Sequence, residues 1–274
     1  MKQSPLYEAT AGRSHLADGL KDIREGFESR AIWRELVRRD LYAKTKGASL
    51  GKWWIIIAQA IAISGIGLVY AQLFGMTLAD YLPYLATGLI TWGFMIALIN
   101  EAPDVFVASK GYLTQTRFPL SVCVFRYVTR NVFMFLYKAL IILVVLVIFQ
   151  VPLGWSTLIA IPGVALIALA GFFTAVILGL LNARYRDIGQ LVSSLTVFLF
   201  FMTPVFWRAD RLGEYGWVVQ YNPLYNFLTL VRSPLIGEPI TYWPFLMTGG
   251  SIAVLAVLAT IVYRIHGREV IYWL

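Results

Sequence analysis

Cysteine and charge are the two scarcest features of this 274-residue sequence. Its one cysteine, Cys123, cannot form a disulfide within the chain or build a cysteine metal cluster, and such a thiol normally packs as a small apolar residue. Charged residues make up 14% of the chain and hydrophobic residues 59%, whereas a soluble domain is about 45–50% apolar. Because the charges fall in blocks between long uncharged runs, we expect lipid to surround those runs. The sequence therefore predicts an all-α integral membrane protein.

The sequence also lacks a nucleotide-binding loop. The nearest candidate begins at Gly47, but it has three residues between its glycines where a phosphate loop needs four, and Lys52 is followed by Trp53 instead of Ser or Thr. The preceding residues do not predict the buried strand that would aim such a loop at phosphate. We therefore expect this chain to bind no ATP itself, and we interpret the segment as a flexible connection ahead of the first membrane span.

Groups for metal binding or catalysis are equally sparse. His15 and His266 lie at opposite ends of the chain without a cysteine or second histidine nearby, so a zinc site is not expected. The interiors of the apolar runs contain no Asp or Glu, which counts against a proton relay or an intramembrane glycosyl-transfer site. Glu101 and Asp104 lie at the end of the second run, where we expect solvation or pairing with a nearby arginine. We predict no catalytic residue, no metal and no cofactor in this chain.

Six apolar runs are long enough to cross about 30 Å of hydrocarbon at about 1.5 Å per residue. They lie near residues 53–73, 82–100, 124–149, 157–181, 189–207 and 243–263. Pro162 and Pro204 fall inside the fourth and fifth runs, where membrane helices tolerate proline. Residues 1–51 are polar, whereas a cleavable signal has its apolar stretch within about the first 30 residues, so we expect insertion to begin with the first span.

Basic residues indicate which side of the membrane each loop occupies. Most of the 23 Lys and Arg precede the first run, follow the second and fourth, or follow the sixth. The opposite side holds only Arg208, Arg211 and Arg232, and Lys138 lies within a run. By the positive-inside rule, both termini are expected in the cytoplasm. The net charge of +8 could also suggest a nucleic-acid partner, but membrane sidedness explains it better.

The segment before the first span has a helical apolar stripe. Leu16, Leu20, Ile23 and Phe27 recur at helical spacing, and a second stripe around Trp33 continues among arginines and acids. A basic helix with one apolar face is suited to the membrane interface. The alternative is a helix packed on cytosolic protein. We treat residues 1–52 as a cytoplasmic and interfacial region, residues 53–264 as the six-span domain and residues 265–274 as a cytoplasmic tail.

Residues 208–242 are too long for a hairpin between the fifth and sixth spans. Turn signals at Asn222-Pro223, Ser233-Pro234 and Glu238-Pro239 alternate with apolar stretches. Short helices that re-enter the outer leaflet would explain both features. A folded extracytoplasmic loop is the alternative.

Lys138 lies deep inside the third predicted span, which is entered through Arg126 and Arg130. An ammonium group at membrane depth costs about 2.5–3.5 kcal/mol on insertion scales and normally faces a cavity or a partner, although its long stem could also reach the headgroups. Aromatic residues form 15% of the chain and gather in the fifth run. Their rings could stack on sugars, or they could serve as interfacial anchors and packing groups.

Several short motifs now fall into a familiar order. They are Arg39-Asp40-Leu41, Leu50-Gly51, Trp54, Arg117-Phe118-Pro119-Leu120, Asn182-Ala183-Arg184-Tyr185-Arg186-Asp187-Ile188, Thr203-Pro204-Val205-Phe206, Tyr221-Asn222-Pro223 and Tyr272-Trp273-Leu274. In this order, and placed relative to six spans, they resemble the permease subunits of ABC exporters of lipid-linked polysaccharides, such as O-antigen, capsule and teichoic acid. The resemblance runs almost end to end.

This resemblance implies partners and roles that the residues alone do not. It implies a homodimer of permeases with two separate ATPase subunits, which bind ATP and Mg, on the cytoplasmic face of the bacterial inner membrane. The implied coupling loop to the ATPase comprises Tyr112, Leu113, Gln115, Arg117 and Phe118. The implied gate for a lipid pyrophosphate headgroup comprises Arg34, Arg38, Arg39 and Lys44. A second inner loop holds Arg184, Arg186 and Asp187.

The resemblance also implies that spans one and five of both subunits form the conduit and that the re-entrant segment lines its exit. The candidates for lining the conduit are Tyr70, Lys138, Phe198, Phe201, Phe206 and Trp207. The expected function is therefore export of a lipid-linked polysaccharide, with the energy supplied by a partner ATPase. Two alternatives stay open: an ABC permease for a non-glycan amphiphile such as a drug, and a membrane-embedded enzyme or uncoupled channel.

Overall fold

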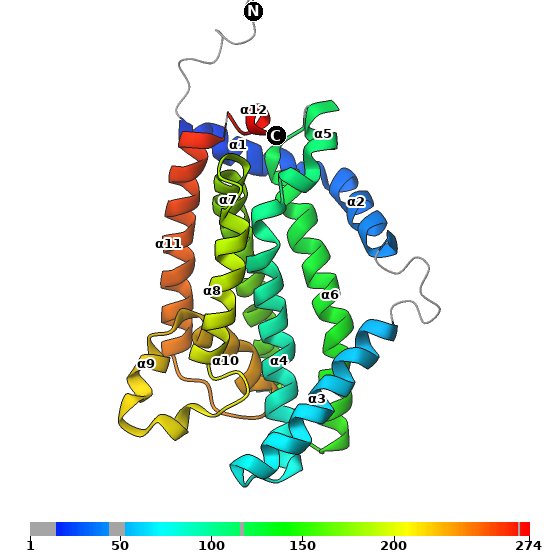
Figure 1. Ribbon diagram of the computed structural model, residues 1–274, viewed down its shortest axis with the longest axis vertical. Coiled ribbons are helices and arrows are strands. Elements are labelled where there is room, and N and C mark those ends of the chain that lie inside the picture. The colour runs from blue at the N-terminus through cyan, green and yellow to red at the C-terminus, as the bar shows by residue number, and fades with distance from the viewer. Residues whose placement is uncertain (1–14, 44–52, 116–117, 268) are drawn as a thin grey trace, which may run out of the picture.

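The described part of the chain is helical throughout. The computed structural model describes residues 15–43, 53–115, 118–267 and 269–274 (Figure 1). Its α-helices are α1 (His15–Glu28), α2 (Arg30–Ala43), α3 (Trp53–Phe74), α4 (Leu78–Asn100), α5 (Lys110–Gln115), α6 (Leu120–Ile148), α7 (Ala160–Arg184), α8 (Ile188–Met202), α9 (Gly216–Gln220), α10 (Pro223–Leu235), α11 (Trp243–His266) and α12 (Val270–Trp273). Short 3-10 turns are η2 (Ala102–Asp104), η3 (Val107–Ser109), η4 (Trp155–Ile159) and η5 (Ala209–Tyr215).

Within the described residues, five helices are long and apolar enough to cross a membrane, namely α3, α4, α6, α7 and α11. Their α-helical segments contain 22 to 29 residues, which at about 1.5 Å per residue matches a hydrocarbon core about 30 Å thick. These helices overlap the first four apolar runs and the sixth. The protein is therefore a multi-pass, all-α membrane protein.

The fifth run differs from its prediction. It was expected to span 189–207, but α8 ends at Met202 and has only 15 residues. Thr203 is extended, with φ −107° and ψ 130°, because the ring of the following Pro204 disfavours helical geometry in the residue before it. An α-helix of this length reaches only about 22 Å. The stretch after Met202 therefore continues as irregular backbone.

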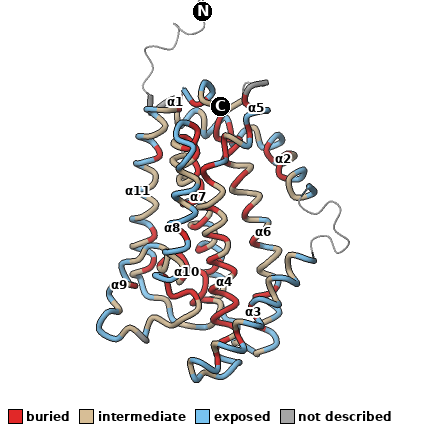
Figure 2. The backbone as a smooth tube through the Cα atoms, in the orientation of Figure 1, coloured by how far each residue is buried: buried red, intermediate tan, exposed pale blue. Residues whose placement is uncertain are grey.

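The helices form a bundle whose interior is built around α4. Figure 2 shows the buried residues concentrated on α4 and on the facing sides of its neighbours. α4 packs against α3, α6, α7, α8 and α10, and α7 packs against α11. The outer faces of α3 and α11 are exposed and apolar, as expected for helices whose solvent is lipid.

The two ends of the bundle have different inventories (Figure 1). One end carries α1, α5 and α12, so the first and last described helices lie together; we refer to it as the α1 end. The other carries α9 and α10 and is the α10 end. Residues 208–242 form short helices, as predicted, and α10 is largely buried against α4, α7 and α11.

The N-terminal amphipathic region forms two helices, whereas the sequence predicted one interfacial helix. The break falls at Ser29, whose hydroxyl donates to the carbonyl of Glu25 at 2.8 Å. Trp33 and Val37 of α2 are buried against Val122 of α6, so this apolar stripe is covered by the chain's own bundle. α1 lies across the starts of α6 and the end of α11.

Candidate functional site

The loop between α4 and α6 presents a short helix at the α1 end. Leu113 of α5 is buried in the main core, whereas Tyr112 beside it is exposed. Phe118 is half-buried and packs on the core, and Gln115 is the last residue of α5. Arg117 lies outside the described residues. α5 is thus anchored on one side and open on the other.

Arg126 joins three helices at this end. Its guanidinium makes two hydrogen bonds to the Asp40 carboxylate, at 2.8 and 2.6 Å, which tie α6 to α2. The ring of Tyr112 on α5 lies 5.5 Å from the same guanidinium. The pair is largely shielded from solvent, so its two-pronged geometry gives both strength and orientation. Arg126 of α6 therefore contacts both α2 and α5.

A second ion pair fixes the end of α4 to α6. Arg130 donates to the Glu101 carboxylate, which also accepts from the Asn131 amide at 3.2 Å. Of the two expectations for Glu101, solvation or pairing with a nearby arginine, the structure shows the pairing. The Tyr127 hydroxyl donates to the Leu98 carbonyl in the last turn of α4. Beside these groups is a cavity of about 280 Å³ lined by Asn100, Glu101, Asp104, Val105, Ala108, Ser109, Cys123, Arg126, Tyr127 and Arg130.

The arginines predicted to form a headgroup gate lie along α2. Arg38 and Arg39 are exposed and share the Glu35 carboxylate, at 3.0 and 3.1 Å. Their hydrogen bonds lower the pKa of Glu35. Arg34 is exposed, with its guanidinium 5.5 Å from the Trp33 ring. The fourth predicted residue, Lys44, lies outside the described residues.

The second inner loop is joined to the C-terminal helix. Arg184 lies with its guanidinium 5.2 Å from the Trp273 ring, and Arg186 donates to the Trp273 carbonyl at 3.3 Å. Asp187 precedes α8 without a side-chain cap bond. Asn182 joins both inner loops, because its amide donates to the Pro103 carbonyl at 3.0 Å while its oxygen accepts from the residue 189 amide at 3.1 Å. The predicted Arg184 and Arg186 therefore belong to one assembly with the tail.

At the α10 end, the irregular backbone after α8 is held by side chains from α4 and α10. The Tyr81 hydroxyl donates to the Phe206 carbonyl at 2.7 Å, and the Tyr84 hydroxyl donates to the Trp207 carbonyl at 2.7 Å. Arg232 donates to the Pro204 carbonyl at 2.8 Å. These groups satisfy carbonyls that α8 would have used had it continued, as irregular backbone at membrane depth requires.

We call Tyr81, Tyr84 and Arg232 the brace, and Arg232 is its least expected member. The sequence analysis counted it among the three cations on the side opposite the termini, and its side chain is only 2% exposed, with the guanidinium 4.1 Å from the Tyr84 ring centre. The sequence analysis also missed Tyr81 and Tyr84. Their spacing of three residues on one helix face was the available signal, but nothing in the sequence shows which backbone they meet more than a hundred residues later.

The candidates for lining a conduit fall into separate groups. Tyr70 of α3 contacts Phe206, with ring centres 5.5 Å apart, so these two are packing partners. Phe198 and Phe201 are 59% and 63% exposed on α8. Trp207 follows α8 and is half-buried. Lys138 is half-buried on α6. This helix and α8 both pack against α4 (Figure 1). The open aromatic face of α8 is the part that could line a shared passage.

Residues 32–236 match the ABC-2 type transporter family, from the first turn of α2 to the end of α10. The chain belongs to this family. ABC-2 membrane subunits are permeases that are not themselves catalytic and that function with ATPase subunits. The matched region contains both inner loops, α8 and the brace at the α10 end, whereas α1, α11 and α12 lie outside it.

Two relatives of this ABC-2 permease are named for the same transport process. The O-antigen export system permease protein RfbA of Klebsiella pneumoniae is 23% identical over 209 residues, covering 76% of this chain and 81% of the relative. The protein of the same name from Myxococcus xanthus is 26% identical over 216 residues, with the same two coverages. These are distant relatives that align over most of both chains.

Proposed function

We propose that this ABC-2 permease exports a lipid-linked polysaccharide across the bacterial cytoplasmic membrane, driven by ATP hydrolysis in a separate subunit. The observation that carries the proposal is the combination of an anchored α5 with the open aromatic face of α8. α5 offers a surface for an ATPase at one end, and Phe198 and Phe201 offer rings on which sugars can stack. The likeness to O-antigen export permeases supports the choice of substrate class.

In this proposal, the α1 end faces the cytoplasm. Most of the described Lys and Arg lie toward that end, on α1, α2, the start of α6 and the end of α7, in agreement with the positive-inside rule. α8 and the irregular residues 203–207 together make the fifth of six crossings. α10 is a re-entrant helix within the outer leaflet. Its buried contacts with α4, α7 and α11 support that position, because backbone at membrane depth must be covered by protein.

The proposed mechanism is a shift between conformations of a permease dimer. Two copies of this chain would pair so that their α3 and α8 faces border the conduit, and two ATPase subunits holding ATP and Mg would contact α5 of each copy. ATP binding would close the ATPases and displace α5, and Arg126 would pass that displacement to α2 and α6. Arg34, Arg38 and Arg39 would attract the lipid pyrophosphate, with Lys44 near them in sequence.

ATP hydrolysis tests this proposal. The chain is purified alone and together with the ATPase encoded beside it, and hydrolysis is measured with and without a lipid-linked glycan. We expect hydrolysis only in the assembled transporter and a change in its rate when the glycan is added. Hydrolysis by the chain alone would refute the division of labour. Hydrolysis that responds to small amphiphiles but not to glycans would assign the permease to the non-glycan class.

A further inference from the structure

The first turn of α6 lacks a capping side chain of its own. The first backbone N–H groups of a helix have no partner within that helix. Pro119 stands at the cap position of α6 and makes no side-chain cap bond. Proline has no side-chain acceptor, so these N–H groups need a partner from elsewhere in the chain.

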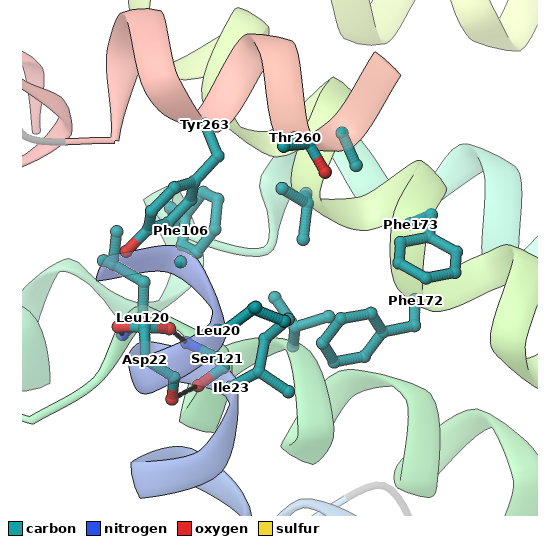
Figure 3. Close-up of a pocket in the computed structure, with 14 residues that line it drawn as sticks. Leu20, Asp22, Ile23, Phe106, Leu120, Ser121, Phe172, Phe173, Thr260 and Tyr263 are labelled. Atoms are coloured by element: carbon teal, nitrogen blue, oxygen red, sulfur yellow. Dashed lines mark hydrogen bonds between the residues drawn. The ribbon is translucent and has the colours of Figure 1, made fainter. Parts of the chain in front are cut away.

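Asp22 of α1 supplies that partner from 98 residues away. Its two carboxylate oxygens accept hydrogen bonds from the backbone N–H groups of Leu120 and Ser121, each at 2.9 Å (Figure 3). The Ser121 hydroxyl in turn donates to the backbone carbonyl of Asp22 at 2.6 Å. A carboxylate is also favoured at this place by the helix dipole. Asp22 thus does for α6 what an N-cap residue usually does from within the same helix.

The face of α1 around Asp22 is shaped for close contact. A Cβ atom on Gly26 would stand 2.0 Å from the Ser121 Oγ, so only glycine fits there without a shift of α6 or α1. One turn before Asp22, Gly19 faces the ring of Tyr263 on α11. The spacing of three and four residues puts Gly19, Asp22 and Gly26 on one side of the helix.

Apolar packing under α1 is incomplete near Asp22. A cavity of about 160 Å³ lies under α1, and Leu20, Ile23, Phe172, Phe173 and Tyr263 line it (Figure 3). Leu20 remains 70% exposed. Side chains that border a cavity lose dispersion contacts on that side. The hydrogen bonds to Asp22 therefore tie α1 to α6 where apolar packing is incomplete, and the ring contact of Phe27 with Phe125, 6.0 Å between centres, adds to them.

We propose that Asp22 is a positioning residue, which holds α1 on the first turn of α6 and thereby fixes the start of α6 relative to α5. The importance of α5 rests on the proposed function, in which α5 contacts the ATPase. The tie itself belongs to the isolated chain and is independent of any partner. α1 is thus a strap whose attachment decides how freely the coupling loop can move.

Amide hydrogen exchange of the full chain in lipid nanodiscs tests this role without ATPase or substrate. In Asp22→Ala, we expect exchange about five- to tenfold faster in α1 and in the first turn of α6, the effect of losing a good cap. We expect faster exchange in α5 as well, and no change in the central part of α7. Glu28→Ala is the matched control, because Glu28 is an exposed carboxylate on the same helix that pairs only along its surface with Arg24.

Two results would overturn the proposal. Unchanged exchange in α1 would mean that Asp22 does not hold it, and faster exchange in α1 with unchanged α5 would mean that the strap does not position the coupling loop. Should Asp22→Ala fail to fold, Asp22→Asn keeps one acceptor oxygen and is expected to give an intermediate rate. A wild-type rate in Asp22→Asn would equally reject a role for the second carboxylate bond. None of these results depends on whether the chain exports a glycan.

Discussion

At the α1 end, arginine–carboxylate ion pairs join α6 to α2 and to the end of α4, whereas at the α10 end tyrosine hydroxyls and a guanidinium donate to main-chain carbonyls of the segment after α8. Asp40 with Arg126 and Glu101 with Arg130 represent the first kind. Tyr84 with the Trp207 carbonyl represents the second. Exposed ion pairs, such as those of Glu35 with Arg38 and Arg39, can exchange partners at modest cost. The shielded Asp40–Arg126 pair and the carbonyls at the α10 end cannot lose their partners cheaply. The α1 end therefore combines exposed pairs that can exchange with shielded pairs that orient its helices, whereas the α10 end is held through main-chain carbonyls.

Removal of Arg232 should have the largest effect of any single change at the α10 end. In Arg232→Met, the Pro204 carbonyl loses its charged donor inside the protein, and we expect a loss of about 2–3 kcal/mol in unfolding free energy. The measurement is denaturant or thermal unfolding of the purified protein. Arg208→Met is the control, since Arg208 is about one-third exposed and pairs with Glu238 at 2.8 Å. Equal losses in both variants would contradict the rigid brace.

Removal of Asp40 should cost less stability but should loosen the link between α2 and α6 more. In Asp40→Ala, Arg126 keeps its charge without its carboxylate, and we expect a loss of about 1–2 kcal/mol in unfolding free energy. A double-mutant cycle with Arg126→Ala separates the pair from its surroundings. Glu35→Ala is the matched control on α2, because its ion pairs are exposed. A coupling energy near zero would show that Arg126 does not join α2 to α6.

The two tyrosine hydroxyls should each contribute a smaller and similar amount. In Tyr81→Phe and Tyr84→Phe, the ring stays in place and one hydrogen bond to a carbonyl is lost, so we expect about 1 kcal/mol for each. Unfolding of the single and double variants measures this. The Tyr81 and Tyr84 changes should be additive within error if the segment is held at independent points. A double variant no weaker than either single one would argue against that.

The smallest expected effect is a pH dependence of α1 attachment. Burial raises the pKa of the Asp22 carboxyl above its ordinary value, although hydrogen bonds from Ser121 oppose this. The attached state thus takes up a proton more readily, so attachment is strongest below the ordinary pKa of Asp22 and weakens as pH rises through the raised value. The other titratable groups around it are Glu25 on α1, Cys123 on α6 and Tyr263 on α11.

This sign can be checked with a spin label on α1. Lys21→Cys provides an exposed attachment site, and the native Cys123 is buried. We expect the label to become less mobile as pH falls from neutral toward the pKa of Asp22, and to lose this dependence when Asp22→Asn is added. Greater mobility at the lower pH would contradict the assigned cause of the pKa shift.

Hydropathy and charge together predicted much of the fold. The runs for α3, α4, α6, α7 and α11 were visible because lipid leaves an uninterrupted apolar stretch in the sequence. The helix at α8 was predicted too long because the residues after Pro204 are still apolar, although Pro204 ends the helix. The break at Ser29 was missed because the apolar stripes on its two sides have nearly continuous spacing.

The functional site was less predictable. Glu101 could be expected to find an arginine because both lie near the same end of neighbouring spans. Asp22 could not be assigned to α6, since nothing local links it to a helix start 98 residues away. The burial of Arg232 could not be predicted from its position in a loop, because it depends on that loop folding back against α4. Contacts between distant segments depend on tertiary packing, which the apolar pattern alone does not specify.

The most direct test of the account is transport by the assembled complex in proteoliposomes. The permease and its ATPase are reconstituted with a labelled lipid-linked glycan in one leaflet, and the glycan reaching the other leaflet is measured after ATP is added. We predict translocation that requires ATP, both subunits and an intact Asp40–Arg126 pair. Hydrolysis of ATP without any movement of the glycan, or movement of the glycan without the ATPase, would contradict the account.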